Sequence, residues 1–390
     1  MSVETLHFKV ANGDMSLIKT HSGRFILVDI NISASADDKD EDAPDVGAQL
    51  RNALDRDGDG RLFVDAFLLT HPDMDHCSGL ENHFHLGKIE DWSPEDDKII
   101  IREMWSSPIV FRRASSTNKL CADAKAWAKE ARRRVEMFRQ DEDIEDGSRI
   151  LVLSEDADGK TDDLTDILIK TGETISEICG VADDSFEAIL LAPLPITDDE
   201  DEEELLSKNN SSVITQFTLA KDGTKNAAQY LFGGDAEVVI WEKIWAEYSE
   251  TPKVLAYDVL IAPHHCSWRS LSHDSWSKKG KDAAVSDDAR SALSQANGGA
   301  IILASSKTIL DDDNDPPCIR AKDEYEDILK ATDINGEFRC LQDEKGDKPM
   351  KMEITEDGPK IVTLKMAAAI SSSSALGVEA HAHGCGSDKA

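Results

Sequence analysis

Hydrophobic residues along this chain fall into short apolar runs that alternate with segments of helical periodicity. The runs at residues 66–69, 230–232 and 259–262 are bounded by turn-forming or polar residues, a pattern typical of buried strands. Apolar side chains recur at helical spacing in residues 122–140, and a second helix is predicted over 236–248. This alternation of strands and helices indicates an α/β protein.

Other segments break the alternation. Residues 91 to about 185 combine an arginine-rich helix with polar, acidic stretches and are expected to form an insertion. Seven consecutive acidic residues, Asp198–Glu204, are too highly charged to fold alone and predict an exposed loop. A hairpin is predicted over residues 351–365, and residues 367–390 read as a flexible, low-complexity tail.

Four potential metal ligands lie within six residues directly after the apolar run 66–69. In an extended segment, side chains two positions apart share a face, so His71 and Asp73 are expected to point the same way. Asp75 and His76 are left at the turn that follows and are expected to face the same pocket. Ordinary turn chemistry is the alternative, but two imidazoles and two carboxylates at this density favour a metal site.

Further candidate ligands follow the two later runs. Gly233–Gly234 allows a sharp turn that presents Asp235 at a strand end, either as a carboxylate that bridges two cations or as a cap of the next helix. His264 and His265 follow the other run. Adjacent residues of a regular strand face opposite ways, so we expect only one of these two histidines to be a ligand, without preferring either.

These motifs resemble those of the metallo-β-lactamase fold. The first is similar to His-x-His-x-Asp-His, with Asp73 in place of the second histidine, as in the hydrolase domain of ComEC-type DNA-uptake competence proteins and their soluble relatives. The other segments that resemble this branch occur in the family's order: residues 12–18, 25–29, 209–213, 231–237 and 262–267.

The resemblance implies a four-layer αβ/βα sandwich with its active site along one edge. It also implies a hydrolase domain over residues 1–366, with the insertion at about 91–185 inside it and the tail 367–390 beyond it. Two departures concern the site: Asn209 stands where many relatives carry a histidine, and Cys266 stands where they carry glycine.

The implied cofactor is a pair of divalent metal ions, zinc in the first instance. Manganese and magnesium are alternatives, because Asp73 adds a hard oxygen ligand. His71, Asp73 and Asp235 are assigned to one ion. The other is assigned to Asp75, His76, Asp235 and one of His264 and His265, with Asp75, His76 and Asp235 as the catalytic residues.

The function that follows is hydrolysis by a metal-activated water, with a phosphodiesterase or nuclease-like activity favoured. One alternative keeps the metals but gives them a lactone, thioester or amide. The other is a catalytically degenerate binding module, with Asn209 marking a decayed site.

Charge limits the substrate. Forty-three basic residues face 77 acidic ones, a formal net charge of -34, which repels long nucleic acids. A small phosphodiester or a nucleic acid is the expected partner, and protein partners are left open. The basic cluster Arg132–Arg134 is either a solvated helix face or a lid that contacts phosphate.

The start of the chain lacks the charged and apolar regions of a signal peptide, and no run approaches the ~20 apolar residues that span a membrane. Seven scattered cysteines, without paired spacing, fit reduced thiols. We therefore expect a cytoplasmic protein that makes no use of a membrane.

Overall fold

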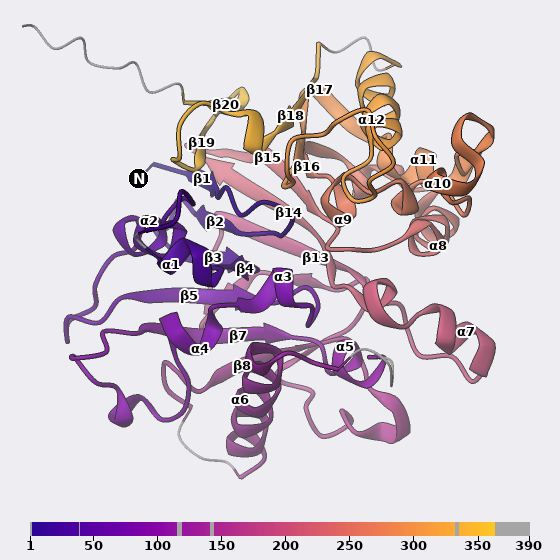
Figure 1. Cartoon of the computed structure of the whole chain (residues 1–390). Helices are drawn as coiled ribbons and strands as arrows, with labels where there is room; N and C mark the ends of the chain where they lie inside the picture. The colour runs from indigo at the N-terminus through magenta and orange to yellow at the C-terminus, as the bar shows by residue number, and fades with distance from the viewer. Residues whose placement is uncertain (1, 39, 115–118, 141–143, 332–334, 363–390) are drawn as a thin grey trace, which may run out of the picture.

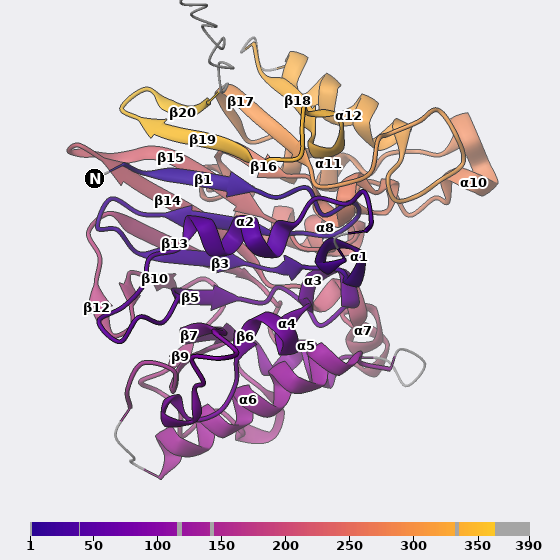
Figure 2. The same ribbon diagram turned by 60° about the vertical axis from the view of Figure 1, so that its left-hand side comes forward.

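Two β-sheets pack face to face, and helices cover the outer face of each (Figures 1 and 2). The computed structural model describes residues 2–38, 40–114, 119–140, 144–331 and 335–362. In spatial order, the first sheet contains β20 (Gly358–Ile361), β19 (Met350–Thr355), β1 (Glu4–His7), β2 (Ser16–Lys19), β3 (Phe25–Val28), β5 (Phe63–Leu68), β7 (Ile99–Ser106), β8 (Arg149–Leu153) and β9 (Leu168–Ile169), with β6 (Phe84–His85) also paired to β7. The second contains β10 (Thr174–Ile175), β13 (Phe186–Ala192), β14 (Ile214–Lys221), β15 (Thr224–Phe232), β16 (Tyr257–Ile261), β17 (Ala296–Ala304) and β18 (Glu337–Cys340).

The helices divide between the two outer faces. Those that pack on the first sheet are α2 (Val46–Ala53), α4 (Leu80–His83) and α6 (Ala122–Arg139). Those that pack on the second are α8 (Val238–Tyr248), α11 (Asp287–Leu293) and α12 (Ile319–Ala331). Shorter elements are β4 (Ile30–Asn31), the pair β11 (Glu177–Ile178) and β12 (Val181–Ala182), α1 (Ala34–Asp37), α3 (Met74–Cys77), α5 (Pro108–Arg112), α7 (Glu200–Leu205), α9 (Pro263–Cys266) and α10 (Trp276–Lys279).

Three hydrophobic cores separate the four layers. Between the sheets, Trp105 of β7 meets Phe217 of β14 with ring centroids 6.4 Å apart. On the first outer face, Phe67 of β5 packs edge-on against Trp127 of α6 at 4.8 Å. The third core lies between the second sheet and α8, α11 and α12. The four-layer αβ/βα sandwich expected from the resemblance is thereby confirmed.

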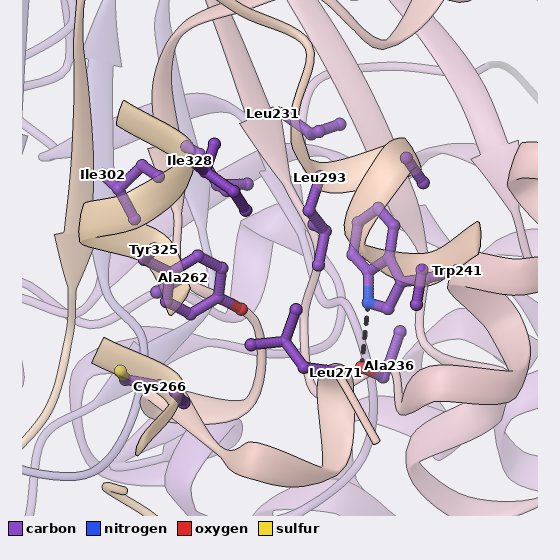
Figure 3. Packing of buried hydrophobic residues seen from close by; sticks show 14 of the residues in the cluster. Leu231, Ala236, Trp241, Ala262, Cys266, Leu271, Leu293, Ile302, Tyr325 and Ile328 are labelled. Atoms are coloured by element: carbon purple, nitrogen blue, oxygen red, sulfur yellow. Dashed lines mark hydrogen bonds between the residues drawn. The ribbon is translucent and has the colours of Figure 1, made fainter. Parts of the chain in front are cut away.

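The third core also fixes a turn that matters for the site. Figure 3 shows Trp241 of α8 beside Ala236, whose carbonyl accepts a hydrogen bond from the Trp241 indole N–H at 3.1 Å. The hydroxyl of Ser270 donates to the same carbonyl at 3.0 Å. Truncation of such a fully buried tryptophan costs about 3–5 kcal/mol. The position of Asp235, which precedes Ala236, is therefore fixed by the core rather than by loop contacts alone.

Several predicted elements agree with the structure. The helix predicted over 122–140 is α6, and the C-terminal hairpin is formed by β19 and β20. Residues 91–185, which were expected to form an insertion, supply α6 but also β7 and β8, which are strands of the first sheet. The predicted tail, 367–390, lies outside the described residues. Within the described ranges, no helix combines the length and apolarity needed to cross a bilayer.

The acidic run 198–204 was wrongly predicted as a loop, because most of it forms α7. Asp199 caps this helix by accepting hydrogen bonds from the N–H groups of Asp201 and Glu202. Negative charge in the first turn also favours the helix dipole. Glu203 is then paired with the guanidinium of Arg113 at 2.7 Å. The helix cap and the ion pair thus outweigh the repulsion between the acidic side chains, on which the loop prediction was based.

Candidate metal centre

Each sheet sends two parallel strands to one edge of the sandwich, and the residues after them form the candidate site. β3 and β5 are parallel neighbours, as are β15 and β16. Their carboxyl ends lead to Asp29, His71, Asp235 and His264 respectively. The N–H of Val213 donates to the carbonyl of Thr70 at 2.8 Å and ties the two edges together.

Asp235 lies at the centre of four imidazoles. Its Oδ2 atom is 3.5 Å from Nε2 of His71 and 3.6 Å from Nε2 of His264. Its Oδ1 atom is 3.1 Å from Nε2 of His76 and 3.3 Å from Nε2 of His265. The two oxygens of one buried carboxylate thus face two separate pairs of histidines. The cap of α8 is Glu237 rather than Asp235, so the helix-cap alternative for Asp235 does not hold.

The two aspartates of the first motif lie on opposite sides of this arrangement. Asp75 Oδ2 is 3.5 Å from His265 Nε2, and Asp73 Oδ2 is 4.0 Å from His71 Nε2. Asp73 occupies the N-cap position of α3, but its side chain makes no capping hydrogen bond. The structure therefore gathers all seven residues predicted as ligands around one point, with Asp73 on the outside.

The adjacent histidines do not lie on a regular strand, so the reason given for only one of them being a ligand is wrong. His264 and His265 have φ angles of 51° and 53°, in the left-handed region, and Cys266 has a φ of 67°. This tight turn lets both Nε2 atoms face Asp235. Cys266 adopts the conformation that glycine accepts most readily, which is the residue at this position in the resembling family. The side-chain nitrogen of Asn209 lies 3.5 Å from His264 Nε2.

Asp29, which received no role from the sequence, lies behind the first motif. Its carboxylate accepts hydrogen bonds from the N–H of Thr70 at 2.7 Å, the hydroxyl of Thr70 at 2.5 Å and Nδ1 of His76 at 2.8 Å. The Thr70 oxygen also lies 3.2 Å from Nδ1 of His71, and it must accept there because its hydrogen is used on Asp29. In the neutral form of each ring the proton is therefore on Nδ1, and Nε2 is the atom left to face Asp235.

Asp14 was also missed. Asp14, His76, Asp235 and His265 offer ligand atoms that lie within 4.8 Å of one another, and all four residues are buried. Asp14 Oδ1 is 3.7 Å from His265 Nδ1, on the far side of that ring from Asp235. The sequence held a signal for each of the two missed residues. Asp14 follows a glycine beside a strand, as Asp235 does, and Asp29 directly follows the apolar run that ends at Val28.

The donor set fits a divalent metal ion. Buried polar atoms at this point have no hydrogen-bond partner within the described residues: Asp14 Oδ1, His71 Nε2, Asp235 Oδ1, His264 Nδ1 and His265 Nδ1. In their neutral forms, His71 and His76 would bring Nε2 lone pairs against carboxylate oxygens, so these contacts call for a proton or a metal ion between the two atoms. Imidazole and carboxylate are also the ligands that zinc and the harder divalent ions take.

The ionisation of these groups follows the same logic. Burial opposes the charge of Asp235, but the imidazoles of His265 and His76 outweigh it and hold the pKa of Asp235 well below its ordinary range. Burial likewise opposes protonation of His76 and His265, but the carboxylates raise the pKa of both well above the ordinary value. For His264, burial prevails and lowers the pKa. The centre thus stabilises positive charge among these side chains.

The arginine cluster does not belong to the centre. Arg134 is buried and donates to the carbonyls of Arg149 and Ile101 and to Glu130. Arg133 also pairs with Glu130. These two side chains therefore form neither a solvated helix face nor a lid that contacts phosphate. They connect α6 to the structure beneath it.

No family model and no curated protein matches the sequence. Among solved structures, the crystal structure of unliganded yeast PDE1 is similar, at 13% sequence identity and a TM-score of 0.41, over 87% of this chain and 98% of that chain. At this degree of likeness, the αβ/βα architecture is established by the sheets, helices and cores of the chain itself.

Proposed function

We propose that the protein is a metal-dependent hydrolase that cleaves phosphodiesters at a centre for two divalent ions. The observation that carries the proposal is the division of Asp235 between two pairs of histidines. His71, Asp73, Asp235 Oδ2 and His264 would hold one ion. Asp75, His76, Asp235 Oδ1 and His265 would hold the other, with Asp14 beside them. Zinc suits the imidazoles, and manganese or magnesium would suit the carboxylates.

Such ions supply Lewis acidity and a nucleophilic hydroxide at neutral pH. The residues of the chain orient the ligands and the attacking water. Asp29 holds the proton of His76 on Nδ1 and so keeps Nε2 available. Asp75, at the open side of the centre, is placed to accept a hydrogen bond from the attacking water and orient it. Asp75, His76 and Asp235 are the catalytic residues of this proposal.

The finer assignments belong to the same proposal. The order of the motifs supports the competence-protein branch of the fold. The hydrolase domain would extend over residues 1–366, and the absence of disulfides among the described cysteines is compatible with a cytoplasmic location.

The test is elemental analysis of protein purified without chelator or affinity-tag metal, alongside an Asp75→Ala, His76→Ala control. We expect about two ions per chain in the wild type and a marked loss in the control, with reconstituted protein hydrolysing bis(p-nitrophenyl) phosphate. Hydrolysis of lactones, thioesters or amides alone would favour the second enzymatic alternative. Bound metal without hydrolysis of any ester class would favour the binding module, and no metal after reconstitution would refute the proposal.

A further inference from the structure

A hollow of about 270 Å³ opens directly beside the centre. Asp73 and Asp75 form one part of its lining, and Lys119 and Lys208 form another. Met74, of which 66% is exposed, also lines it and offers an apolar surface. A group bound in this hollow would therefore touch the metal-facing carboxylates and two lysines at once.

The two lysines are unusual in a chain with a net charge of -34. Among the ion pairs formed by described residues, none includes Lys119 or Lys208, whereas nearby Arg113 is paired with Glu203 at 2.7 Å. Among the described residues these two lysines have no carboxylate partner, and Asp73 and Asp75 of the same lining would be engaged by the metal ions, so the lysines are the charged groups left to meet a ligand. Their charge attracts an anion and gives a neutral molecule no advantage.

The backbone holds Lys208 in a strained conformation. Its φ of 55° lies in the left-handed region, which non-glycine residues rarely adopt. Its N–H donates to the carbonyl of Arg113 at 3.2 Å, and its own carbonyl accepts from the hydroxyl of Ser211 at 2.7 Å. The next residue, Asn209, reaches His264 of the centre. Strain held by several contacts beside a site is a mark of a positioned functional residue.

The size of the hollow limits the anion. Its volume lies just below the roughly 300–1,000 Å³ of small-molecule sites, so it suits one phosphodiester group with a compact substituent. A duplex would bring many more negative charges against an acidic surface. A lactone, thioester or amide without charge would leave both lysines unused.

We propose that Lys208, assisted by Lys119, is a positioning and specificity-determining residue that holds the negative charge of a small phosphodiester in this hollow. The proposal rests on the proposed function, because it assigns the substrate of the same centre. The lysines select for an anionic substrate, while Asp75, His76 and Asp235 remain the catalytic residues.

The test compares two p-nitrophenyl substrates that differ in charge, using the full-length, metal-loaded protein. Bis(p-nitrophenyl) phosphate carries one negative charge, and diethyl p-nitrophenyl phosphate carries none. For Lys208→Met we expect KM for the diester to rise about tenfold, with kcat changed less than about twofold and with no effect on the neutral triester. Lys208→Arg should restore most of the loss. Lys225→Met, which removes the same charge near the distant start of β15, should resemble the wild type.

Calorimetric titration with inorganic phosphate gives a readout that does not need turnover. Phosphate should bind the wild type and bind Lys208→Met about tenfold more weakly. If the enzyme hydrolyses esters but Lys208→Met affects both substrates equally, or neither, the inference is overturned and the proposed function stands. If nothing is hydrolysed but phosphate binding depends on Lys208, the hollow is an anion site and the proposed hydrolysis, with the substrate role of Lys208, fails. Absence of both hydrolysis and phosphate binding overturns both.

Discussion

Nδ1 of His76 lies 2.8 Å from Oδ2 of Asp29, and both side chains are completely buried. The same carboxylate accepts two hydrogen bonds from Thr70. Asp29 thereby connects the end of β3 to the motif that follows β5 and sets the tautomer of the histidine. A carboxylate behind an imidazole in this way orients a metal ligand and increases its basicity.

Replacing Asp29 with asparagine should weaken metal binding by about 10–100-fold, because the orienting negative charge is lost while the shape is kept. Competition with a chromophoric zinc chelator measures the affinity, and circular dichroism checks the fold. Asp258→Asn is a matched control, since Asp258 is also a partly buried carboxylate that accepts a backbone N–H, from Gln229 at 2.7 Å. Equal affinities for Asp29→Asn and this control would contradict the orienting role.

Gly13 is required by the close approach of two chain segments beside Asp14. A Cβ atom there would lie 2.2 Å from Nδ2 of Asn31 and 2.7 Å from the backbone oxygen of Asp75, and the φ of Gly13 is 153°. We expect Gly13→Ala to lower the free energy of unfolding by about 2 kcal/mol or more and to weaken metal binding through displacement of Asp14.

Gly58→Ala is the control for this substitution, because a Cβ atom at Gly58 meets nothing within 4 Å. Its free energy of unfolding in urea should stay within about 0.5 kcal/mol of the wild-type value. Equal stability of the two variants would mean that the segments around Gly13 separate without cost.

The strand-end ligands could be predicted from sequence because their signal is local. An apolar run followed by a turn and a histidine or aspartate identifies His71 or Asp235 without any knowledge of the partner strand. Asp14 and Asp29 carry a similar local signal, but their roles could not be assigned from it, since these roles depend on contacts with segments far along the chain. The left-handed turn at His264 and His265 could not be predicted for another reason. Non-glycine residues rarely adopt that conformation, so the two histidines were expected to continue the strand.

Cys121 should be the most reactive cysteine of the described chain. Its sulfur lies 3.4 Å from that of Cys77, and a hydrogen bond from Cys77 lowers the pKa of Cys121 to about 6, despite partial burial that acts in the opposite direction. The N–H of Ala124, in the first turn of α6, also donates to this sulfur. At pH 7 most of Cys121 should therefore be thiolate, the form that reacts with alkylating agents.

Iodoacetamide labelling at pH 7, followed by peptide mass spectrometry, measures this reactivity. Labelling of Cys121 should fall as the pH is lowered through about 6. Cys77→Ala removes the donor and should slow the reaction at least about tenfold, whereas Cys318→Ala should not change it. A rate for Cys121 that rises only above pH 8 would show that the pair does not share a proton as described.

His7 should make the protein sensitive to mild acid. Its imidazole is fully buried between the sheets, with Nδ1 2.9 Å from the hydroxyl of Ser16 and Nε2 3.1 Å from that of Thr5. Burial lowers the pKa of His7 from 6.5 to about 4, against a smaller opposing effect of Asp14. Between these two values the unfolded chain binds a proton that the folded chain does not.

The stability that neutral His7 contributes is therefore complete above pH 6.5 and is lost as the pH falls towards 4, by about 3 kcal/mol in all. His7→Gln keeps hydrogen-bonding groups but cannot titrate. Its free energy of unfolding in urea should consequently decline less than that of the wild type between pH 6.5 and 4.5. His273→Gln, at a side chain that is 60% exposed, should follow the wild-type curve. A decline in His7→Gln that is parallel to that of the wild type would show that His7 is not the source of the acid sensitivity.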